Sequence, residues 1–178
     1  LPRFELKALL GLLARTRANI LPAVPTLLNA IARADAATPE QLASLEVAIS
    51  GGAALPDEVR HAFGKKSGAI LAEGYGLTEA SPVVCCAALR VPSKPMSIGL
   101  PLPGTDIRFV DIDSGAVVGI GENGELQVRG RQVMAGYYEN PEATRDAFMD
   151  GWLRTGDVGH MDEDGYVFLV DRIKDLII

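Results

Sequence analysis

The sequence has no apolar run that approaches the roughly 20 residues a helix needs to cross a bilayer. It also has no basic stripe and no interleaving of basic and aromatic residues, and its formal net charge is −6. A nucleic acid is therefore not an expected partner. The 48% apolar and 22% charged residues are typical of a globular domain. We expect a cytoplasmic protein without a transmembrane segment, and a peripheral contact with the inner face of a membrane stays open.

Cysteine is scarce. The only two, Cys85 and Cys86, are adjacent and poorly placed to bond each other, which indicates a reducing compartment. A starting methionine is absent, and the chain ends on KDLII without a polar closing segment. We therefore expect a piece of a longer polypeptide.

The first half of the sequence alternates helix and strand signals. Apolar residues recur at helical spacing near the start, and Pro25 and Pro56 each mark the first turn of a further helix. A capping box, Thr38 with Gln41, starts another helix. Short apolar runs between the helices, ANILPAV, LEVAIS and AILA, are typical of strands. This alternation predicts a partial, mostly parallel layered sheet with helices over residues 1–95.

The second half has a different pattern. Short alternating runs such as TDIRFVDI, ELQVRG and YVFLVD are separated by the turn signals DSG, ENG and DEDG. One helix, capped by Asn140, interrupts them at 141–148. We predict a small antiparallel β-barrel-like subdomain over 96–171, so the fold class is α/β followed by that subdomain.

Several familiar motifs are absent or misleading. GIGENG at 119–124 has the letters of a dinucleotide fingerprint, but a strand follows it where that fingerprint needs a helix. MDEDGYVF lacks the frame of a calcium loop and predicts a hairpin turn. The two histidines have no partner at zinc-ligand spacing, and no G-x-S-x-G elbow is present.

Two glycine-rich turns are candidate ligand sites. ISGGAALP and LAEGYGLTEASP each follow a predicted buried strand, and ligands collect at the carboxyl ends of parallel strands. Glycine lets a flat ring approach the backbone, Tyr75 offers a stacking face, Thr78 a phosphate-bonding hydroxyl and Glu79 a carboxylate for Mg²⁺. Two solvent-facing turns would explain the same residues equally well. Asp157 in GWLRTGDVG could accept hydrogen bonds from a ribose diol, although a turn aspartate is the simpler interpretation of that window alone.

Five motifs in order carry a resemblance to a known family: SGGAALP, EGYGLTEASPVV, GELQVRGRQVMAGYYENPEAT, GWLRTGDVGHMDEDGY and DRIKDLII. Together they resemble the adenylate-forming (AMP-binding) enzyme superfamily over nearly the whole chain. Within that superfamily they look most like long-chain fatty-acid–CoA ligases. The resemblance implies an enzyme that activates a fatty acid with ATP and Mg²⁺ as acyl-adenylate and transfers it to coenzyme A.

The resemblance also implies roles for residues of this sequence. A nucleotide site would be formed by Gly52, Ala53, Glu73, Gly74, Tyr75, Gly76, Thr78, Asp157 and Arg172. Gly74 and Tyr75 would pack on the adenine ring, and Asp157, helped by Arg172, would hold the ribose hydroxyls. Thr78 would bond the phosphate.

The same resemblance assigns four further roles. Glu79 would hold Mg²⁺ and, with Thr78, act in catalysis. Gly76 and Val83 would begin the acyl pocket, and Lys174 would lie in a hinge, 172–178, to a C-terminal domain. A Ser/Thr/Gly-rich phosphate loop and the lysine-bearing C-terminal domain of the family are missing from this sequence. It therefore resembles the later part of the large N-terminal domain, and we expect the isolated chain to be inactive and to self-associate.

Two alternatives remain. An adenylation domain that serves a carrier-protein thiol shares these motifs, as does a non-catalytic adenylate-binding module. The fit of Thr78, Glu79, Asp157 and Arg172 to their roles argues against the second alternative.

Overall fold

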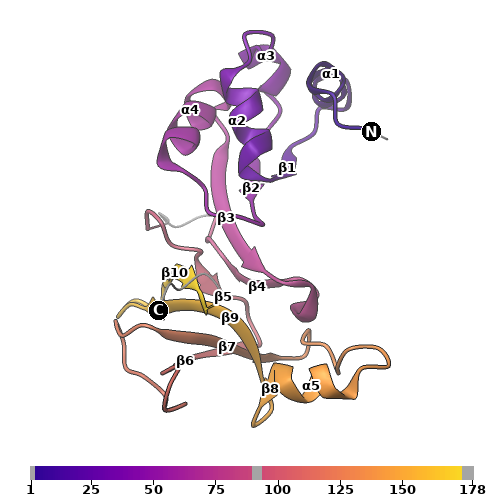
Figure 1. The fold of residues 1–178 in the computed structure, drawn as a ribbon. Coiled ribbons are helices and arrows are strands. Elements are labelled where there is room, and N and C mark those ends of the chain that lie inside the picture. Colours follow the sequence, from indigo (N-terminus) through magenta and orange to yellow (C-terminus); the bar gives the residue numbers. More distant parts are fainter. Residues whose placement is uncertain (1–2, 90–93, 174–178) are drawn as a thin grey trace. The chain divides into compact units, whose positions relative to one another are not determined.

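The computed structural model describes residues 3–89 and 94–173 (Figure 1). The chain divides into two compact units, one from Leu1 to Glu73 and one from Gly74 to Ile178. The boundary between the units falls within strand β3 (Ile70–Gly76), after Glu73. The expected α/β fold with a second, antiparallel part is confirmed, while the subdomain limits at residues 95 and 171 and the hinge at 172–178 stay predictions.

The first unit contains four helices and three strands among its described residues: α1 (Leu6–Thr16), β1 (Ile20–Ala23), α2 (Pro25–Arg33), α3 (Pro39–Leu42), β2 (Val47–Ser50), α4 (Asp57–Ser67) and the start of β3 (Ile70–Gly76). Pro25 occupies the first turn of α2, as predicted. Helix α4 ends at Gly68, which adopts the left-handed conformation that glycine tolerates best. The Thr38–Gln41 capping box is formed in both directions, so these helix limits follow from local sequence.

The three strands of this unit pair in parallel, in the order β1-β2-β3. Leu21, Ala48 and Leu71 lie opposite one another in register and contribute to the apolar core with the helices. Phe63 of α4 is fully buried in the same core. The helices therefore cover one face of the parallel sheet.

The other face of these strands is apolar but more open. Ile20, Val47 and Ile70 occupy one row across the strands. Ile20 and Ile70 are each 52% exposed, although parallel sheets are usually covered on both faces. This face is an apolar surface in the described part of the chain.

The second unit is built mainly from antiparallel strands. Its elements are the end of β3, the 3₁₀ turn η1 (Thr78–Ala80), β4 (Val83–Cys86), β5 (Leu100–Pro101), β6 (Thr105–Val110), β7 (Gly124–Gly130), α5 (Pro141–Ala147), β8 (Phe148–Met149), β9 (Trp152–Met161) and β10 (Val167–Arg172). One sheet has the order β10-β9-β7-β6, with β8 on β9, and β3, β4 and β5 pair in a second. Val84, Leu126, Val128 and Val167 form its fully buried core.

The turn between β9 and β10 is the hairpin that MDEDGYVF predicts. The Asp162 carboxylate accepts hydrogen bonds from the backbone N–H groups of Asp164 and Tyr166 at 3.0 and 2.9 Å. Gly165 has φ +85°, which favours glycine. The acidic residues therefore serve the turn itself. GIGENG likewise precedes strand β7, as expected for a turn.

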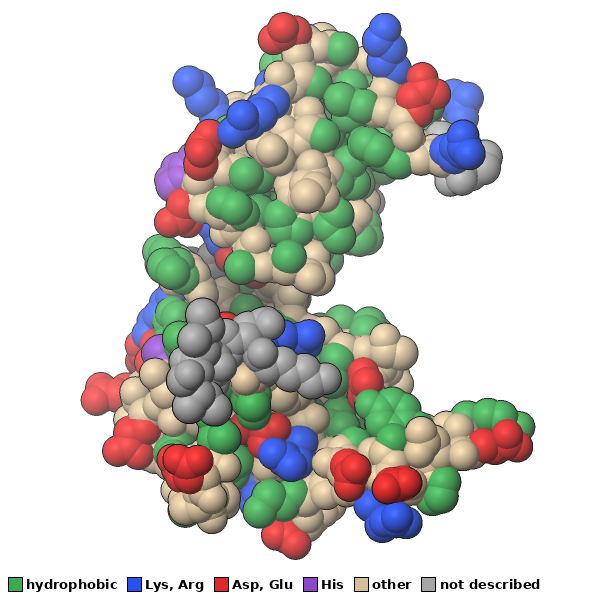
Figure 2. Space-filling view, in the orientation of Figure 1, with side chains coloured by type: hydrophobic (Ala, Val, Ile, Leu, Met, Phe, Trp, Pro, Cys, Tyr) green, Lys and Arg blue, Asp and Glu red, His purple; other side chains and the backbone are tan. Residues whose placement is uncertain are grey.

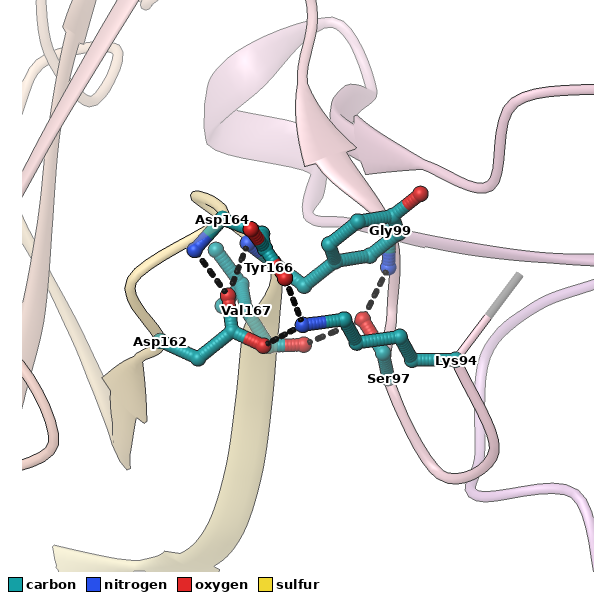
Figure 3. Close-up of polar contacts among 7 residues, drawn as sticks. All are labelled: Lys94, Ser97, Gly99, Asp162, Asp164, Tyr166 and Val167. Atoms are coloured by element: carbon teal, nitrogen blue, oxygen red, sulfur yellow. Dashed lines mark hydrogen bonds and ion pairs between the residues drawn. The ribbon is translucent and has the colours of Figure 1, made fainter. Parts of the chain in front are cut away.

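Lys94, in the segment before β5, forms ion pairs with two residues of this hairpin (Figure 3). Its ammonium group lies 2.5 Å from Asp162 and 2.6 Å from Asp164, and 5.0 Å from the centre of the Tyr166 ring. Lys94 lowers the pKa of the Asp162 carboxyl. The contact joins segments 68 residues apart in sequence.

Ser97 completes this attachment beneath Lys94 (Figure 3). Its hydroxyl donates to the Val167 carbonyl and accepts from the Gly99 N–H, both at 2.9 Å. Since Ser97 is buried, these bonds satisfy a polar group that would otherwise be costly to bury.

Charged side chains of both signs are mixed over the face drawn in Figure 2.

No helix in the described residues is both long and apolar enough to span a bilayer.

Candidate active site

The turn after β2 exposes the two residues expected near an adenine ring. Gly52 and Ala53 are exposed, and Gly52 has φ +82°. A Cβ on Gly52 would meet only the Val24 side chain at 3.7 Å, so the backbone conformation, rather than crowding, favours glycine. Beside this turn, the Ser50 hydroxyl is buried and has no hydrogen-bond partner among the described residues. The turn therefore offers open backbone at the carboxyl end of a strand.

Glu73, another expected nucleotide residue, is engaged within the first unit. Glu73 is the last residue of β3 that pairs with β2, and it is 9% exposed. Its carboxylate forms an ion pair with Arg60 of α4. Burial raises the pKa of the Glu73 carboxyl, and Arg60 partly offsets that rise. No local pattern indicates this pair, because the two residues are 13 apart in sequence, one on helix α4 and the other on the strand that follows it.

Tyr75, Asp157 and Arg172 come together in the second unit. Asp157 on β9 is only 5% exposed, and the register of β9 with β10 places Arg172 opposite it. The Tyr75 hydroxyl donates to Asp157 Oδ2 at 2.5 Å, and Arg172 Nε donates to Oδ1 at 2.6 Å. Burial, followed by the hydrogen bond to Asp157, raises the pKa of the Tyr75 phenol far above its ordinary value. The three expected residues thus form one connected group.

This group holds a carboxylate with unused acceptor capacity. A carboxylate has about four lone-pair sites, and Tyr75 and Arg172 occupy one on each oxygen of Asp157. The Asp157 backbone N–H also donates to Thr155 Oγ1 at 3.1 Å. Asp157 is therefore held in a fixed orientation and can still accept hydrogen bonds from a ligand.

Thr78 and Glu79 lie on η1, directly after β3. Thr78 is exposed, and Glu79 is half-buried. The Glu79 carbonyl accepts from the Met134 N–H at 2.7 Å, and Glu79 Oε1 accepts from the Tyr137 hydroxyl at 2.8 Å. The turn thus presents a hydroxyl and a carboxylate next to each other.

The donor atoms of this turn suit Mg²⁺. Carboxylate and hydroxyl oxygens are hard ligands, and Mg²⁺ in nucleotide sites typically uses one or two carboxylates with phosphate oxygens and waters. The described residues contain no cluster of three or more His, Cys, Asp or Glu side chains that could hold a metal alone. Glu79 could therefore hold the ion only as one ligand of a metal–nucleotide complex.

Gly76 and Val83 face each other across β3 and β4. A Cβ on Gly76 would lie 2.0 Å from the Pro82 carbonyl oxygen, so no larger residue fits there without movement. Val83 lines a cavity of about 460 Å³ within the second unit, with Leu102, Pro103 and Arg131 among its other walls. The acyl-binding role of both residues stays a prediction.

Tyr137 and Tyr138 lie in the loop that precedes α5. Their side chains are 40% and 90% exposed, so neither belongs to the buried core of the second unit. Trp152 is half-buried, with Arg108 and Arg129 at 4.6 and 4.4 Å from its ring centre. Lys174 lies outside the described residues.

The model of the AMP-binding enzyme family matches residues 1–138, and the chain belongs to that family. It is 40% identical over 181 residues to 4-coumarate–CoA ligase 1 of Oryza sativa subsp. japonica, covering 98% of this chain and 32% of the relative. It is also 40% identical over 178 residues to a long-chain-fatty-acid–CoA ligase of Bacillus subtilis (strain 168), covering 100% and 32%. The chain thus spans about a third of the length of these CoA ligases.

Solved structures give the same classification. ATP-bound MatB from Rhodopseudomonas palustris superposes with a TM-score of 0.92 at 34% identity, over 100% of this chain and 35% of MatB. The amide bond synthetase McbA from Marinactinospora thermotolerans has a TM-score of 0.90 at 35% identity, over 100% and 36%. The fold is therefore that of adenylate-forming enzymes.

Proposed function

We propose that this chain is the nucleotide-binding part of an ATP-dependent acyl-CoA ligase. A carboxylate of the substrate attacks the α-phosphorus of ATP, forming acyl-adenylate and releasing pyrophosphate. The thiol of coenzyme A then attacks the acyl carbon and releases AMP. Catalysis of this kind depends on alignment of the attacking oxygen and on stabilisation of phosphate charge.

The arrangement of Tyr75, Asp157 and Arg172 is the observation that carries this proposal. Asp157 is fixed by two side-chain donors and keeps acceptor sites that suit the two hydroxyls of a ribose. The Tyr75 ring provides an apolar face for adenine while its hydroxyl remains bonded to Asp157. As the motif resemblance implies, Gly52 and Ala53, in the exposed turn after β2, would line the adenine site. Gly74 would pack on the adenine ring, and Glu73 would be a further nucleotide-binding residue.

Thr78 and Glu79 would act on the phosphates. The Thr78 hydroxyl is exposed and would donate to a phosphate oxygen, and Glu79 would contribute one ligand to Mg²⁺. Mg²⁺ held there would neutralise phosphate charge during attack on the α-phosphorus. Gly76 and Val83 would border the acyl group, and Lys174 would serve as a hinge between the two half-reactions.

We propose a long-chain fatty acid as the substrate, because the ordered motifs resemble long-chain fatty-acid–CoA ligases most. The relatives also include 4-coumarate–CoA ligases, so an aromatic acid is the competing substrate class. A cytoplasmic location would suit an enzyme that uses ATP and CoA, and Cys85 and Cys86 are both free thiols.

ATP–pyrophosphate exchange tests this function. It is measured on a protein that contains this chain and has the full length of the CoA-ligase relatives. Hexadecanoate, 4-coumarate and a mixture of amino acids are the three substrate arms, followed by detection of the CoA thioester. Exchange and thioester formation with hexadecanoate support the proposal. Exchange with 4-coumarate alone would replace the substrate class, and exchange with amino acids without a CoA product would favour a carrier-protein adenylation domain. No exchange with any acid would contradict the enzyme assignment.

A further inference from the structure

The loop that precedes α5 holds Glu79 at two points. The Met134 N–H donates to the Glu79 carbonyl at 2.7 Å, and the Tyr137 hydroxyl donates to Glu79 Oε1 at 2.8 Å. The tyrosine and the glutamate are 58 residues apart in sequence. Both contacts lie within the second unit, and together they fix the backbone and the carboxylate of the same residue.

The position of Tyr137 is itself set by the first turn of α5. The Tyr137 N–H donates to Thr144 Oγ1 at 2.9 Å, and that hydroxyl donates to the Asn140 carbonyl at 2.8 Å. Asn140 caps α5 through the Ala143 N–H at 3.0 Å. The Tyr137 backbone is thus attached to a capped helix, which limits the positions that its hydroxyl can take.

The hydrogen bond leaves the second carboxylate oxygen of Glu79 available. Tyr137 bonds Oε1, and no described residue donates a hydrogen bond to Oε2. The tyrosine hydroxyl is an uncharged hydrogen-bond donor. A neutral donor orients the carboxylate without neutralising the charge that a metal ion would need.

We propose that Tyr137 is a positioning residue that orients the Glu79 carboxylate toward the Mg²⁺ of the bound metal–nucleotide complex. This inference rests on the proposed function of Glu79 as a metal ligand. Groups that hydrogen-bond to a metal ligand typically contribute about 10–100-fold to metal affinity. Tyr137 is 40% exposed, so we expect an effect near the lower end, about 10-fold.

Metal affinity, rather than turnover, is the decisive measurement. Tyr137→Phe and the control Tyr138→Phe are made in the enzyme of full family length, because Tyr138 is the 90% exposed neighbour with the same chemistry. Mn²⁺ replaces Mg²⁺, and electron paramagnetic resonance measures its affinity in the presence of a non-hydrolysable ATP analogue. We expect about 10-fold weaker Mn²⁺ binding for Tyr137→Phe and wild-type binding for Tyr138→Phe. Affinity for the analogue in excess EDTA should be equal in all three proteins.

A Glu79→Gln variant separates failure of this inference from failure of the proposed function. Wild-type Mn²⁺ affinity in Glu79→Gln would remove Glu79 from the metal site, and the inference with it. Weakened binding in Glu79→Gln together with wild-type binding in Tyr137→Phe would overturn the inference alone.

Thr144→Val provides a second variant if Tyr137→Phe does not fold. It removes the hydroxyl that attaches the Tyr137 backbone to α5 but keeps the shape of the side chain and the phenol. We expect it to weaken Mn²⁺ binding in the same direction without changing affinity for the metal-free analogue. Unchanged Mn²⁺ affinity in a folded Thr144→Val protein would contradict the proposed positioning role.

Discussion

Replacement of Tyr75 by phenylalanine tests the centre of the site without a ligand. The substitution removes only the hydroxyl that donates to Asp157, a carboxylate that is 5% exposed. Loss of a hydrogen bond to a charged group typically costs about 1.5–3 kcal/mol. Arg172 cannot fully compensate, because its side chain is 64% exposed and exposed ion pairs contribute about 0–1 kcal/mol. We therefore expect Tyr75→Phe to destabilise the second unit by about 1.5–3 kcal/mol.

Urea denaturation followed by tryptophan fluorescence gives a direct measurement of this loss. Trp152 is the only tryptophan of the sequence and lies on β9, the strand that carries Asp157, so its signal follows the second unit. Tyr138→Phe is the matched control, because it removes the same atom from a side chain that is 90% exposed. An equal change in the two variants, within about 0.5 kcal/mol, would refute the argument.

The pH dependence of this difference has a defined sign. Burial and Asp157 raise the pKa of Tyr75 in the folded state above the unfolded value of about 10. The stabilisation is therefore fully present below about pH 10 and decreases as the pH rises through the folded pKa. The difference between wild type and Tyr75→Phe should stay constant between about pH 6 and pH 9. An increase of the difference above about pH 10 would contradict this assignment.

Three further predictions concern the fold and the isolated chain. Lys94→Met should lower the melting temperature at neutral pH. Because Lys94 lowers the pKa of Asp162 in the folded state, this decrease in melting temperature should become smaller as the pH falls below about 3.9. A decrease that does not depend on pH would contradict the prediction. Gly99→Ala should lower the free energy of unfolding by about 3 kcal/mol or more, because the new Cβ would lie 2.1 Å from the Cys86 carbonyl carbon. Gly104→Ala, whose Cβ would have no atom within 4 Å, should lower it by only about 1–2 kcal/mol. Equal midpoints of urea denaturation for the two variants would contradict this difference. The isolated chain should form no acyl-CoA in a coupled assay and should sediment as more than a monomer; turnover by the pure chain or a strictly monomeric species would show that one of these expectations is wrong.

The exposed apolar face of the parallel sheet is a candidate surface for the expected self-association. Ile20 and Ile70 are each 52% exposed on the face of the parallel sheet opposite the helices, and Val24 is 49% exposed. We expect the predicted self-association of the isolated chain to involve this exposed apolar face. An Ile20→Lys and Ile70→Lys double variant should then shift the chain toward monomer in sedimentation velocity.

Local signals in the sequence predicted the elements whose stabilising contacts are local. Thr38 and Gln41 bond each other across one helical turn, and Asp162 bonds the N–H groups two and four residues ahead. Such contacts depend on nearby residue types, so a short window is sufficient to identify them.

Contacts between distant residues could not be predicted from such windows. Glu79 and Tyr137 are 58 residues apart, and neither window indicates the other. Tyr75 and Asp157, 82 residues apart, entered the same predicted site only through the resemblance of their motifs to a family. The structure adds that a direct hydrogen bond joins them, which spacing could not indicate.

Discrimination between ATP and 2′,3′-dideoxy-ATP tests the central claim, that Asp157 holds the ribose hydroxyls, most directly. The exchange assay is run with each nucleotide on two full-length proteins, the wild type and Asp157→Asn. Loss of two hydrogen bonds to a charged group should lower wild-type kcat/KM for the dideoxy nucleotide by about 10²-fold or more. Asp157→Asn should lower kcat/KM for ATP strongly but change the dideoxy value little. An equal loss for both nucleotides would mean that Asp157 maintains the fold through Tyr75 and Arg172 and does not bind the ribose.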